Sequence, residues 1–454
     1  MKTDLSTHNP VWRALVRLRL AADNTEPAKL LLIGYLSYML IGFALLSLPF
    51  AQATPVAALD ALFIATSAVS TTGLVTVDPG TSFTFFGELV VLLLIQIGGL
   101  GYMTIGSFAV LALQDNLGKM RARTCRAAFN LPEDISPKLF LRSVVIFTLI
   151  CEAIGAAILY PKFAAAGVDN PLWAAIFHAV SAFCTAGFSL FSSSLEAFRG
   201  DFTVNATISA LSIFGAMGFL IIVDLWRTLM GRQRNLGFTS KVIFRLTMLF
   251  LILGTAVVMV TDPGIIALPA EERIMTAFFQ VMTAATTVGF NTYPISELSM
   301  AVLLVVMFLM VIGASPAGTG GGLKTTSFAV LIGLVRSTLK GRDEVRFFKR
   351  RVRFEQLQTA TASLVFYLGL MVAALFCLLL TEPALDFAAL LFEALSAMGT
   401  VGLSMGATGE LSPLGKVVII VLMTAGRVGI LTFGIALASR DESREEERDN
   451  ELVM

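Results

Sequence analysis

The sequence predicts an all-α integral membrane protein in which one unit occurs four times: an outer helix, a short helix, a loop and an inner helix. Three observations predict this class. Of 454 residues, 56% are hydrophobic and only 14% are charged, whereas about a quarter of a soluble protein is charged. Eight apolar segments are long enough to cross a bilayer, and four shorter stretches between them share one pattern.

The eight apolar segments have the length that a bilayer requires, roughly 20 residues. They lie at about 29–49, 83–113, 140–160, 205–229, 241–261, 299–336, 358–380 and 413–438. Within each successive pair lies a semi-apolar stretch of about 12–18 residues, too short to cross a hydrocarbon core of roughly 30 Å at about 1.5 Å per residue. We interpret these stretches as re-entrant segments, which protein must surround.

The basic residues predict the orientation. They concentrate after the second, fourth and sixth segments, at 119–126, 227–241 and 336–353, while the opposite loops carry few. Because cytoplasmic loops are enriched in Lys and Arg, both termini are expected in the cytoplasm and the short stretches outside. The N-terminus lacks the features of a signal peptide.

Enzyme chemistry is not indicated. The four cysteines are far apart and only two histidines occur, so neither a metal cluster nor a His-based catalytic centre is expected. The stretch GTGGGLKT (318–325) is similar to a phosphate-binding loop, but the second glycine of that motif falls at Leu323, so the match fails. We expect no enzyme activity, no covalently bound cofactor and no nucleic-acid partner.

The four short stretches align without gaps. They read FIATSAVSTTGL (63–74), FHAVSAFCTAGF (177–188), FQVMTAATTVGF (279–290) and FEALSAMGTVGL (392–403). Each has Phe first, Ser or Thr four residues on, then Ala, then Thr-x-Gly. The residue directly after the Phe differs in every copy, so we interpret His178 as a packed or hydrogen-bonded helix residue and not as a ligand.

Four Thr-x-Gly loops in one chain predict a cation site. A dehydrated cation needs oxygens in place of its water shell, and a ring of backbone carbonyls supplies them. Glycine permits the loop conformation, and the negative end of each short helix would point to the centre. The candidate K⁺-binding residues are Thr71, Thr72, Gly73, Thr185, Ala186, Gly187, Thr287, Val288, Gly289, Thr400, Val401 and Gly402. The alternative is that Thr-x-Gly only ends a packed half-helix.

The stretches TVGF and TVGL look like the potassium-channel filter, and the fourfold single-chain arrangement resembles the Trk/Ktr/HKT superfamily of potassium transporters over about residues 29–438. The length is more similar to the Ktr-type membrane subunit than to the Trk type. The resemblance implies a potassium-channel-like fold, K⁺ uptake through the bacterial inner membrane (the plasma membrane), Na⁺ as an activator, a homodimer and a cytoplasmic nucleotide-binding regulatory subunit. In this superfamily glycine in all four filters accompanies K⁺ preference, which Gly73 satisfies.

Arg427 lies in the middle of the last apolar segment, where a basic residue costs roughly 2.5–3.5 kcal/mol on insertion scales. The matching arginine of the superfamily implies an electrostatic barrier below the filter. The alternative is an ion pair with an intramembrane acid, Glu152 or Glu393. Ile430 stands where the superfamily usually has proline, so the helix geometry beside Arg427 stays open.

The third inner segment is interrupted by MVIGASPAGTGGGLKTTSF (310–328). The resemblance implies that this break is a loop that obstructs the pore and moves on activation. The candidate gate residues are Gly313, Ala314, Ser315, Pro316, Gly318, Thr319, Gly320, Gly321, Gly322, Lys324 and Thr325. The alternative is a fixed kink. Glycines at a similar depth in the other inner segments, such as Gly98, Gly215 and Gly426, serve either close packing or gating.

These observations divide the chain into a cytoplasmic segment (1–28), four units (29–126, 127–235, 236–340 with the break at 313–326, and 341–438) and a charged cytoplasmic tail (439–454). Two other functions remain open: transport of Na⁺ or another monovalent cation by the same fold, and a secondary carrier with broken helices.

Overall fold

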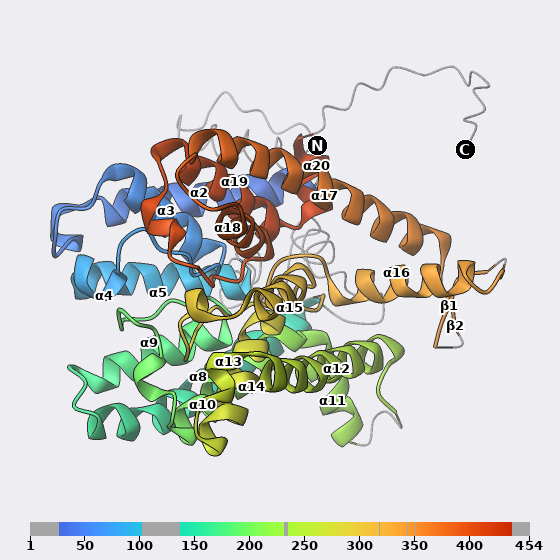
Figure 1. Ribbon diagram of the computed structural model, residues 1–454, viewed down its shortest axis with the longest axis horizontal. Coiled ribbons are helices and arrows are strands. Elements are labelled where there is room, and N and C mark those ends of the chain that lie inside the picture. The colour runs from blue at the N-terminus through green and yellow to red at the C-terminus, as the bar shows by residue number, and fades with distance from the viewer. Residues whose placement is uncertain are drawn as a thin grey trace, which may run out of the picture.

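The structure is a computed structural model that describes residues 27–101, 137–230, 235–316, 318–342, 344–348 and 350–437. This part of the chain is almost entirely helical, with one antiparallel hairpin of β1 (Arg346–Phe347) and β2 (Arg350–Arg351). The hairpin lies beyond the end of α16 (Thr325–Thr338), at the right of Figure 1. The N-terminal segment before residue 27, the charged tail and the first basic loop (119–126) lie outside the described residues.

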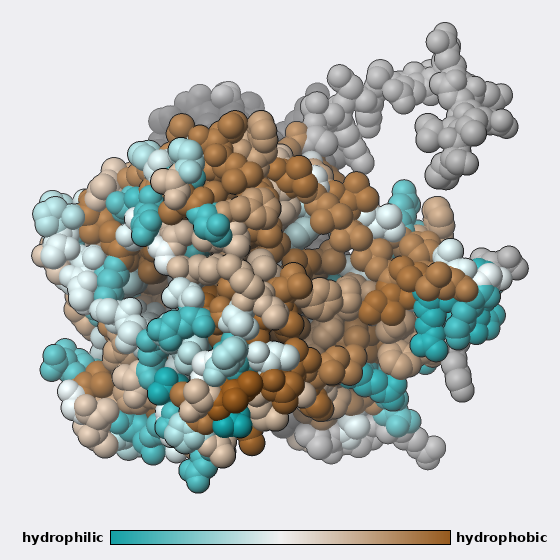
Figure 2. Space-filling view, in the orientation of Figure 1, coloured by the Kyte–Doolittle hydropathy of each residue, from teal (hydrophilic) through white to brown (hydrophobic). Residues whose placement is uncertain are grey.

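In the part of the chain that the structure describes, four helices are long and apolar enough to cross a membrane: α2 (Pro27–Leu46), α8 (Pro137–Ala165), α12 (Phe238–Thr261) and α17 (Phe354–Thr381). They coincide with the first segment of each expected pair. Their outward side chains suit lipid, since Ile252, Val372 and Leu380 are 67–70% exposed. Figure 2 shows broad apolar surface between a polar left edge and the polar cluster at the hairpin.

The inner segments differ from the expectation. The apolar segments 205–229 and 413–438, each expected to contain one inner helix, are each divided into two helices. Gly218 (φ +86°) separates α10 (Phe202–Met217) from α11 (Phe219–Leu229), and Gly429 (φ +96°) separates α19 (Pro413–Val428) from α20 (Ile430–Leu437), which bend by 107°. Helix α5 (Phe85–Leu100) likewise ends at Gly101 (φ +79°). Only glycine adopts such angles readily, and the flanking residues are apolar, so hydropathy does not reveal the break.

The third inner segment is interrupted as predicted. Helix α15 (Met300–Val311) ends before an irregular stretch, and α16 resumes at Thr325. The described residues therefore do not contain eight continuous spans. Besides the four long helices, one bent pair among these residues, α19 and α20, is long and apolar enough to count as a span. Short helical turns complete the fold: α4 (Pro79–Ser82), α13 (Pro263–Ile266), η2 (Pro49–Ala51), η3 (Glu196–Phe198), η4 (Ile295–Glu297) and η5 (Ala407–Glu410).

Four short helices occupy the centre: α3 (Ala58–Val69), α9 (Pro171–Phe183), α14 (Ala270–Thr286) and α18 (Phe387–Gly399). Each short helix packs on the inner helix of its own unit: α3 on α5, α9 on α10, α14 on α15 and α18 on α19. Each also packs on the inner helix of another unit: α9 on α5, α14 on α10, α18 on α15 and α3 on α19. These contacts close into a ring (Figure 1). The C-terminal halves of the short helices are buried within the protein. A segment that enters the membrane without crossing it must be surrounded by protein in this way.

Candidate functional site

Each short helix ends in the same turn. The four threonines at these turns, Thr71, Thr185, Thr287 and Thr400, all have left-handed backbone with φ between 50° and 57°. We call them the turn threonines. Each turn threonine donates its amide hydrogen to the alanine carbonyl three residues earlier, at 3.1–3.3 Å. A non-glycine residue pays about 1–2 kcal/mol for this conformation, so the recurrence at four sites indicates a backbone held by its surroundings.

Two residues after each turn threonine is a glycine with positive φ. These ring glycines are Gly73, Gly187, Gly289 and Gly402. A Cβ atom on any of them would overlap the carbonyl oxygen just before the next ring glycine. The oxygens are, in the same order, those of Ala186, Val288, Val401 and Thr72. The fourth contact returns to the first loop, so the four loops form a closed ring in chain order.

The ring glycines line the floor of an open cavity of about 310 Å³. Polar groups surround it, including Asp78, Ser192, Glu196 and Asn291. Ser192 donates a hydrogen bond to Asp78, and Asn291 Nδ2 donates one of 2.8 Å to Glu196 Oε1. Burial raises the pKa of Glu196, which the hydrogen bond from Asn291 partly opposes. The cavity therefore offers carboxylates and carbonyl groups to a cation above the ring.

On the opposite side of the turns lies the irregular stretch 312–324, which we call the inner loop. Thr319 is its centre. Its Oγ1 lies 3.0 Å from Oγ1 of Thr185 and donates to the carbonyl oxygen of Phe183 at 3.3 Å. Its carbonyl oxygen accepts a hydrogen bond of 3.4 Å from Thr71. Thr319 thus joins the first and second turns.

The next two residues of the inner loop reach the other turns. The amide of Gly321 donates a hydrogen bond of 2.8 Å to Oγ1 of Thr400. A Cβ atom on Gly320 would overlap Oγ1 of Thr287. Three consecutive residues therefore contact all four turn threonines, and two of the three lack side chains because the space is filled.

Several hydrogen bonds hold the inner loop in place. The amides of Ser315 and Thr319 donate to the carbonyl oxygens of Ala216 and Gly215, both at 3.1 Å. At its end, Thr325 Oγ1 donates to Gly313 O at 3.1 Å.

The other predicted gate residues lie in the same stretch. Lys324 Nζ donates to Gly320 O at 2.9 Å, Gly318 N donates to Ser315 O at 3.0 Å, Gly322 has φ +71°, and Ala314 is buried. Pro316 is half-buried. Ten of the eleven predicted gate residues thus belong to the inner loop, and the eleventh, Thr325, begins α16 and is hydrogen-bonded to the loop.

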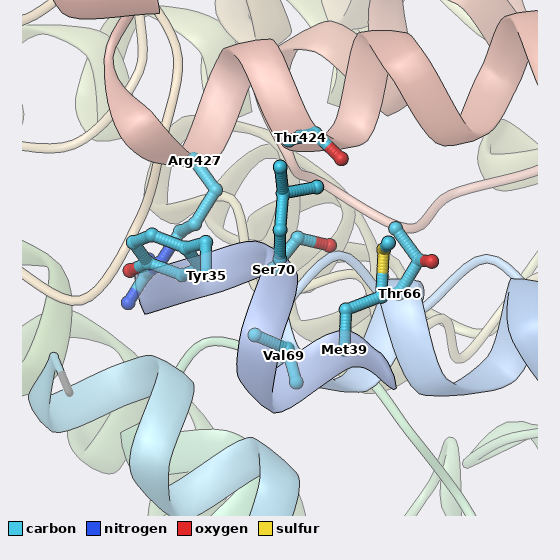
Figure 3. Close-up of a pocket in the computed structure, with 8 residues that line it drawn as sticks. Tyr35, Met39, Thr66, Val69, Ser70, Thr424 and Arg427 are labelled. Carbon is cyan, nitrogen blue, oxygen red and sulfur yellow. The ribbon is translucent and has the colours of Figure 1, made fainter. Parts of the chain in front are cut away.

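Arg427 lies at the end of α19, and its guanidinium points toward Tyr35 of α2 (Figure 3). Nε donates to the Tyr35 hydroxyl at 3.2 Å. The terminal nitrogens donate to the carbonyl oxygens of Thr319 and Gly98, and to that of Gly99 at 3.3 Å. Arg427 therefore links the inner loop to the end of α5.

The suggested ion pair of Arg427 with Glu152 or Glu393 is not what the structure shows. Glu393 accepts hydrogen bonds from Ser404 and Thr408, and Glu152 accepts one from Cys184 Sγ at 3.8 Å. Among the described residues the partners of the guanidinium are carbonyl oxygens and a phenol. Because these partners are neutral, they do not balance the positive charge of Arg427 next to the inner loop.

Comparison with known proteins identifies the family of this chain. The sequence model of one family, TrkH, described as "Cation transport protein", matches residues 39–447. The chain belongs to the TrkH family. It is therefore a member of a family of cation transport proteins and not of enzymes.

Relatives cover nearly the whole chain. It is 35% identical over 434 residues to the Ktr system potassium uptake protein B of Bacillus subtilis, covering 94% of this chain and 96% of that protein. The protein of the same name in Vibrio alginolyticus is 36% identical, with 92% of each chain covered. The potassium/sodium uptake protein NtpJ of Enterococcus hirae is 34% identical, with 94% and 95% covered. The crystal structure of the potassium transporter TrkH from Vibrio parahaemolyticus has a TM-score of 0.70 at 19% identity, covering 91% of this chain and 86% of that one, which indicates the same fold.

In this TrkH-family chain, sequence reasoning missed the partners of the predicted residues. Tyr35 and the carbonyl groups of Gly98 and Gly99 hold Arg427, yet no pattern in the sequence indicates that they are its partners. The glycines of the inner helices are explained by packing: a Cβ on Gly98, Gly215 or Gly426 would overlap the carbonyl oxygen two residues before a turn threonine. In the sequence, the signal for this packing was the similar depth of these glycines in their inner segments.

Proposed function

We propose that this chain takes up K⁺ across the plasma membrane through a pore whose selectivity filter is formed by the loops of the ring glycines. The closed ring of glycine backbones and carbonyl oxygens carries this proposal. Four carbonyl-rich loops at the floor of a polar cavity can replace the hydration shell of a monovalent cation. In this proposal the chain consists of four repeats and eight spans, with the inner spans broken.

We also propose that the inner loop is the gate. It contacts all four turn threonines, so an ion leaving the filter would have to displace it. Arg427 supplies a positive charge at the same depth and is tied to the loop through the carbonyl oxygen of Thr319. Opening then requires that these hydrogen bonds break together, which makes Arg427 both an electrostatic barrier and an anchor for the closed loop.

The remaining features of the proposal concern orientation and partners. The acidic cavity would face outward and the basic hairpin inward, with both termini in the cytoplasm of a bacterial cell. Because the names of two relatives describe a Ktr system, we propose a regulatory subunit on the cytoplasmic side. From the family resemblance we also propose a homodimer of this chain. Na⁺ would act as an activator, and K⁺ in the filter would be cargo.

Growth of a bacterium that lacks its own K⁺ uptake tests the function. The chain should restore growth at low external K⁺, and added Na⁺ should increase it. Co-expression of a cytoplasmic nucleotide-binding subunit would show whether a partner is required. Failure to restore growth by a chain that is present in the membrane, with or without that partner, would contradict K⁺ uptake.

A second candidate is Na⁺ transport by the same pore, which the name of the Enterococcus hirae relative favours. Uptake of radioactive Rb⁺ and Na⁺ into liposomes containing the purified chain separates the two. Faster uptake of Na⁺ than of Rb⁺ would favour the second candidate. The same vesicles test the carrier alternative, because alternating access gives steep temperature dependence and early saturation of flux.

A further inference from the structure

The residue directly after the shared phenylalanine of each short helix has a common role, although the residue type differs in every unit. These residues, Ile64, His178, Gln280 and Glu393, are all fully buried. A buried polar group is costly unless it is hydrogen-bonded. Each of the three polar members makes a hydrogen bond to the segment that follows the ring glycine of its own unit, although Oε1 of Gln280 has no partner.

Glu393 has the most extensive contacts. Its Oε1 accepts a hydrogen bond of 2.5 Å from Ser404 Oγ and one of 3.0 Å from the amide of Met405. Its Oε2 accepts a hydrogen bond of 2.5 Å from Thr408 Oγ1. Ser404 is the second residue after Gly402, so the carboxylate joins α18 directly to the outer end of its filter loop.

His178 makes the equivalent contact in the second unit. Its Nδ1 donates a hydrogen bond of 2.8 Å to Ala174 O, one turn earlier in α9. Its Nε2 lies 2.9 Å from Oγ of Ser189, which is the second residue after Gly187. Ser189 Oγ also accepts from the amide of Phe191 at 2.9 Å, so the imidazole supports the turn that follows the filter.

In the third unit, Gln280 and the second residue after the ring glycine donate hydrogen bonds to the same carbonyl oxygen. Its Nε2 donates a hydrogen bond of 2.7 Å to the carbonyl oxygen of Tyr293. Asn291, the second residue after Gly289, donates to the same oxygen at 3.3 Å.

The first unit has no such bond, and both of its positions are apolar. Ile64 faces an apolar cluster to which Val75, the second residue after Gly73, is also packed. The two positions therefore change together: they are polar in three units and apolar in one. This matching is what a direct structural link between them requires.

We propose that these paired positions are positioning residues of the filter, and that the Glu393–Ser404 pair contributes to the choice between K⁺ and Na⁺. The inference rests on the proposed filter function. The carboxyl group of Glu393 makes three hydrogen bonds to the segment after its ring glycine, more than His178 or Gln280 makes, so the fourth loop is the one held by the most contacts. A ring of carbonyls distinguishes two cations of different size only while its geometry is maintained, and the pairs maintain it from the wall of the cavity above the ring.

Uptake of Rb⁺ and Na⁺ by purified protein in liposomes tests the proposal, with Glu393→Gln, Ser404→Ala and the double variant. Glutamine has the size of the carboxylate but presents an NH₂ group to the hydroxyl donors. The ratio of Rb⁺ to Na⁺ uptake should fall about five-fold in each single variant, as expected from losing one buried hydrogen bond. The double variant should fall no further, because the two residues form one coupled pair.

Glu382→Gln and Ser412→Ala are the matched controls, since Ser412 Oγ also donates a hydrogen bond to a glutamate, at Glu382 Oε1, but this pair lies outside the filter loops. Their uptake ratio should equal that of the wild type. A merely structural role for Glu393 would lower the amount of folded protein and the rate for both ions equally, and an unchanged ratio in both single variants would overturn the proposal. If Glu393→Gln does not fold, Ser404→Ala decides. If the wild type itself takes up no Rb⁺, the proposed function fails instead.

Discussion

The amide of Gly321 donates a hydrogen bond of 2.8 Å to the side chain of Thr400, 79 residues further along the chain. It joins the inner loop to the turn at the end of α18. With Thr319 and Gly320 it brings the loop against all four turn threonines. In the gating mechanism proposed above, this loop closes the space below the ring, and the strength of its contacts should determine how often it leaves.

Thr319→Val should raise basal K⁺ flux. The substitution keeps the volume but removes the hydroxyl that contacts Thr185 at 3.0 Å and Phe183 O at 3.3 Å. Losing buried hydrogen bonds costs about 1–2 kcal/mol, which would shift the closed–open equilibrium roughly 5- to 30-fold. Rb⁺ uptake into liposomes measures the change. Thr326→Val, in the first turn of α16, is the control, and equal flux in both variants would argue for a fixed kink.

Arg427→Ala should also increase flux, because it removes both the positive charge and the bond to the inner loop. Arg427→Lys separates the two effects: lysine keeps the charge but lacks the planar fork that reaches several carbonyl oxygens at once. Flux near that of the wild type in the lysine variant would assign the effect to charge, and flux near that of the alanine variant would assign it to anchoring. Loss of both proteins from the membrane would indicate a role in folding.

Gly73→Ser should weaken the preference for K⁺ over Na⁺. Gly73 has φ +93° and a Cβ there would overlap Ala186 O, so the second loop must move. Gly406→Ser is a matched control, since Gly406 has φ +98° but nothing lies within 4 Å of its Cβ position. The measurement is the ratio of Rb⁺ to Na⁺ uptake. An unchanged ratio in Gly73→Ser would contradict the assignment of this loop to the filter.

Gly215→Ala should destabilise the fold. A Cβ on Gly215 would overlap Phe183 O and lie 2.9 Å from Thr319 Oγ1. Overpacking at such a contact costs about 1–3 kcal/mol. Gly369→Ala provides the comparison, because Gly369 lies in α17 with nothing within 4 Å, and alanine favours a helix by roughly 0.5–1 kcal/mol. The melting temperature in detergent should fall for the first variant only. A normal melting temperature with altered flux would indicate a hinge instead of packing.

Uptake at low K⁺ should fall as the external pH falls, and Glu196 should contribute to this. Burial raises the pKa of Glu196, and nearby Glu297 raises it further while Asn291 and Arg199 oppose the shift. A raised pKa means that the carboxylate is protonated at a higher pH than an ordinary one, so the cavity loses negative charge under mild acid. Glu196→Gln should show a flatter pH profile, with Glu410→Gln, at the end of η5 outside the cavity lining, as control. Identical profiles for the wild type and Glu196→Gln would exclude this carboxylate.

Local patterns were sufficient to predict much of the site. The Thr-x-Gly repeat follows from the backbone angles that one turn requires, so four copies are visible when the chain is aligned with itself. Arg427 was predicted because a charge in an apolar segment is costly. The inner loop was predicted because glycine and proline interrupt a helix. Each of these signals is contained within about twenty residues.

Contacts between distant segments could be decided only by the tertiary structure. In the sequence the Gly-rich loop stands next to the third filter alone, and only the fold brings Thr319 to the first and second turns and Gly321 to the fourth. Arg427 had two acidic candidates in the sequence, and the fold gives it carbonyl oxygens and Tyr35 instead. His178 and Glu393 differ in chemistry, so no alignment suggests that they do the same work. The sequence by itself determined which backbone turns and helices form, because those depend on neighbouring residues. Which turns, loops and charges meet depends on how the helices pack.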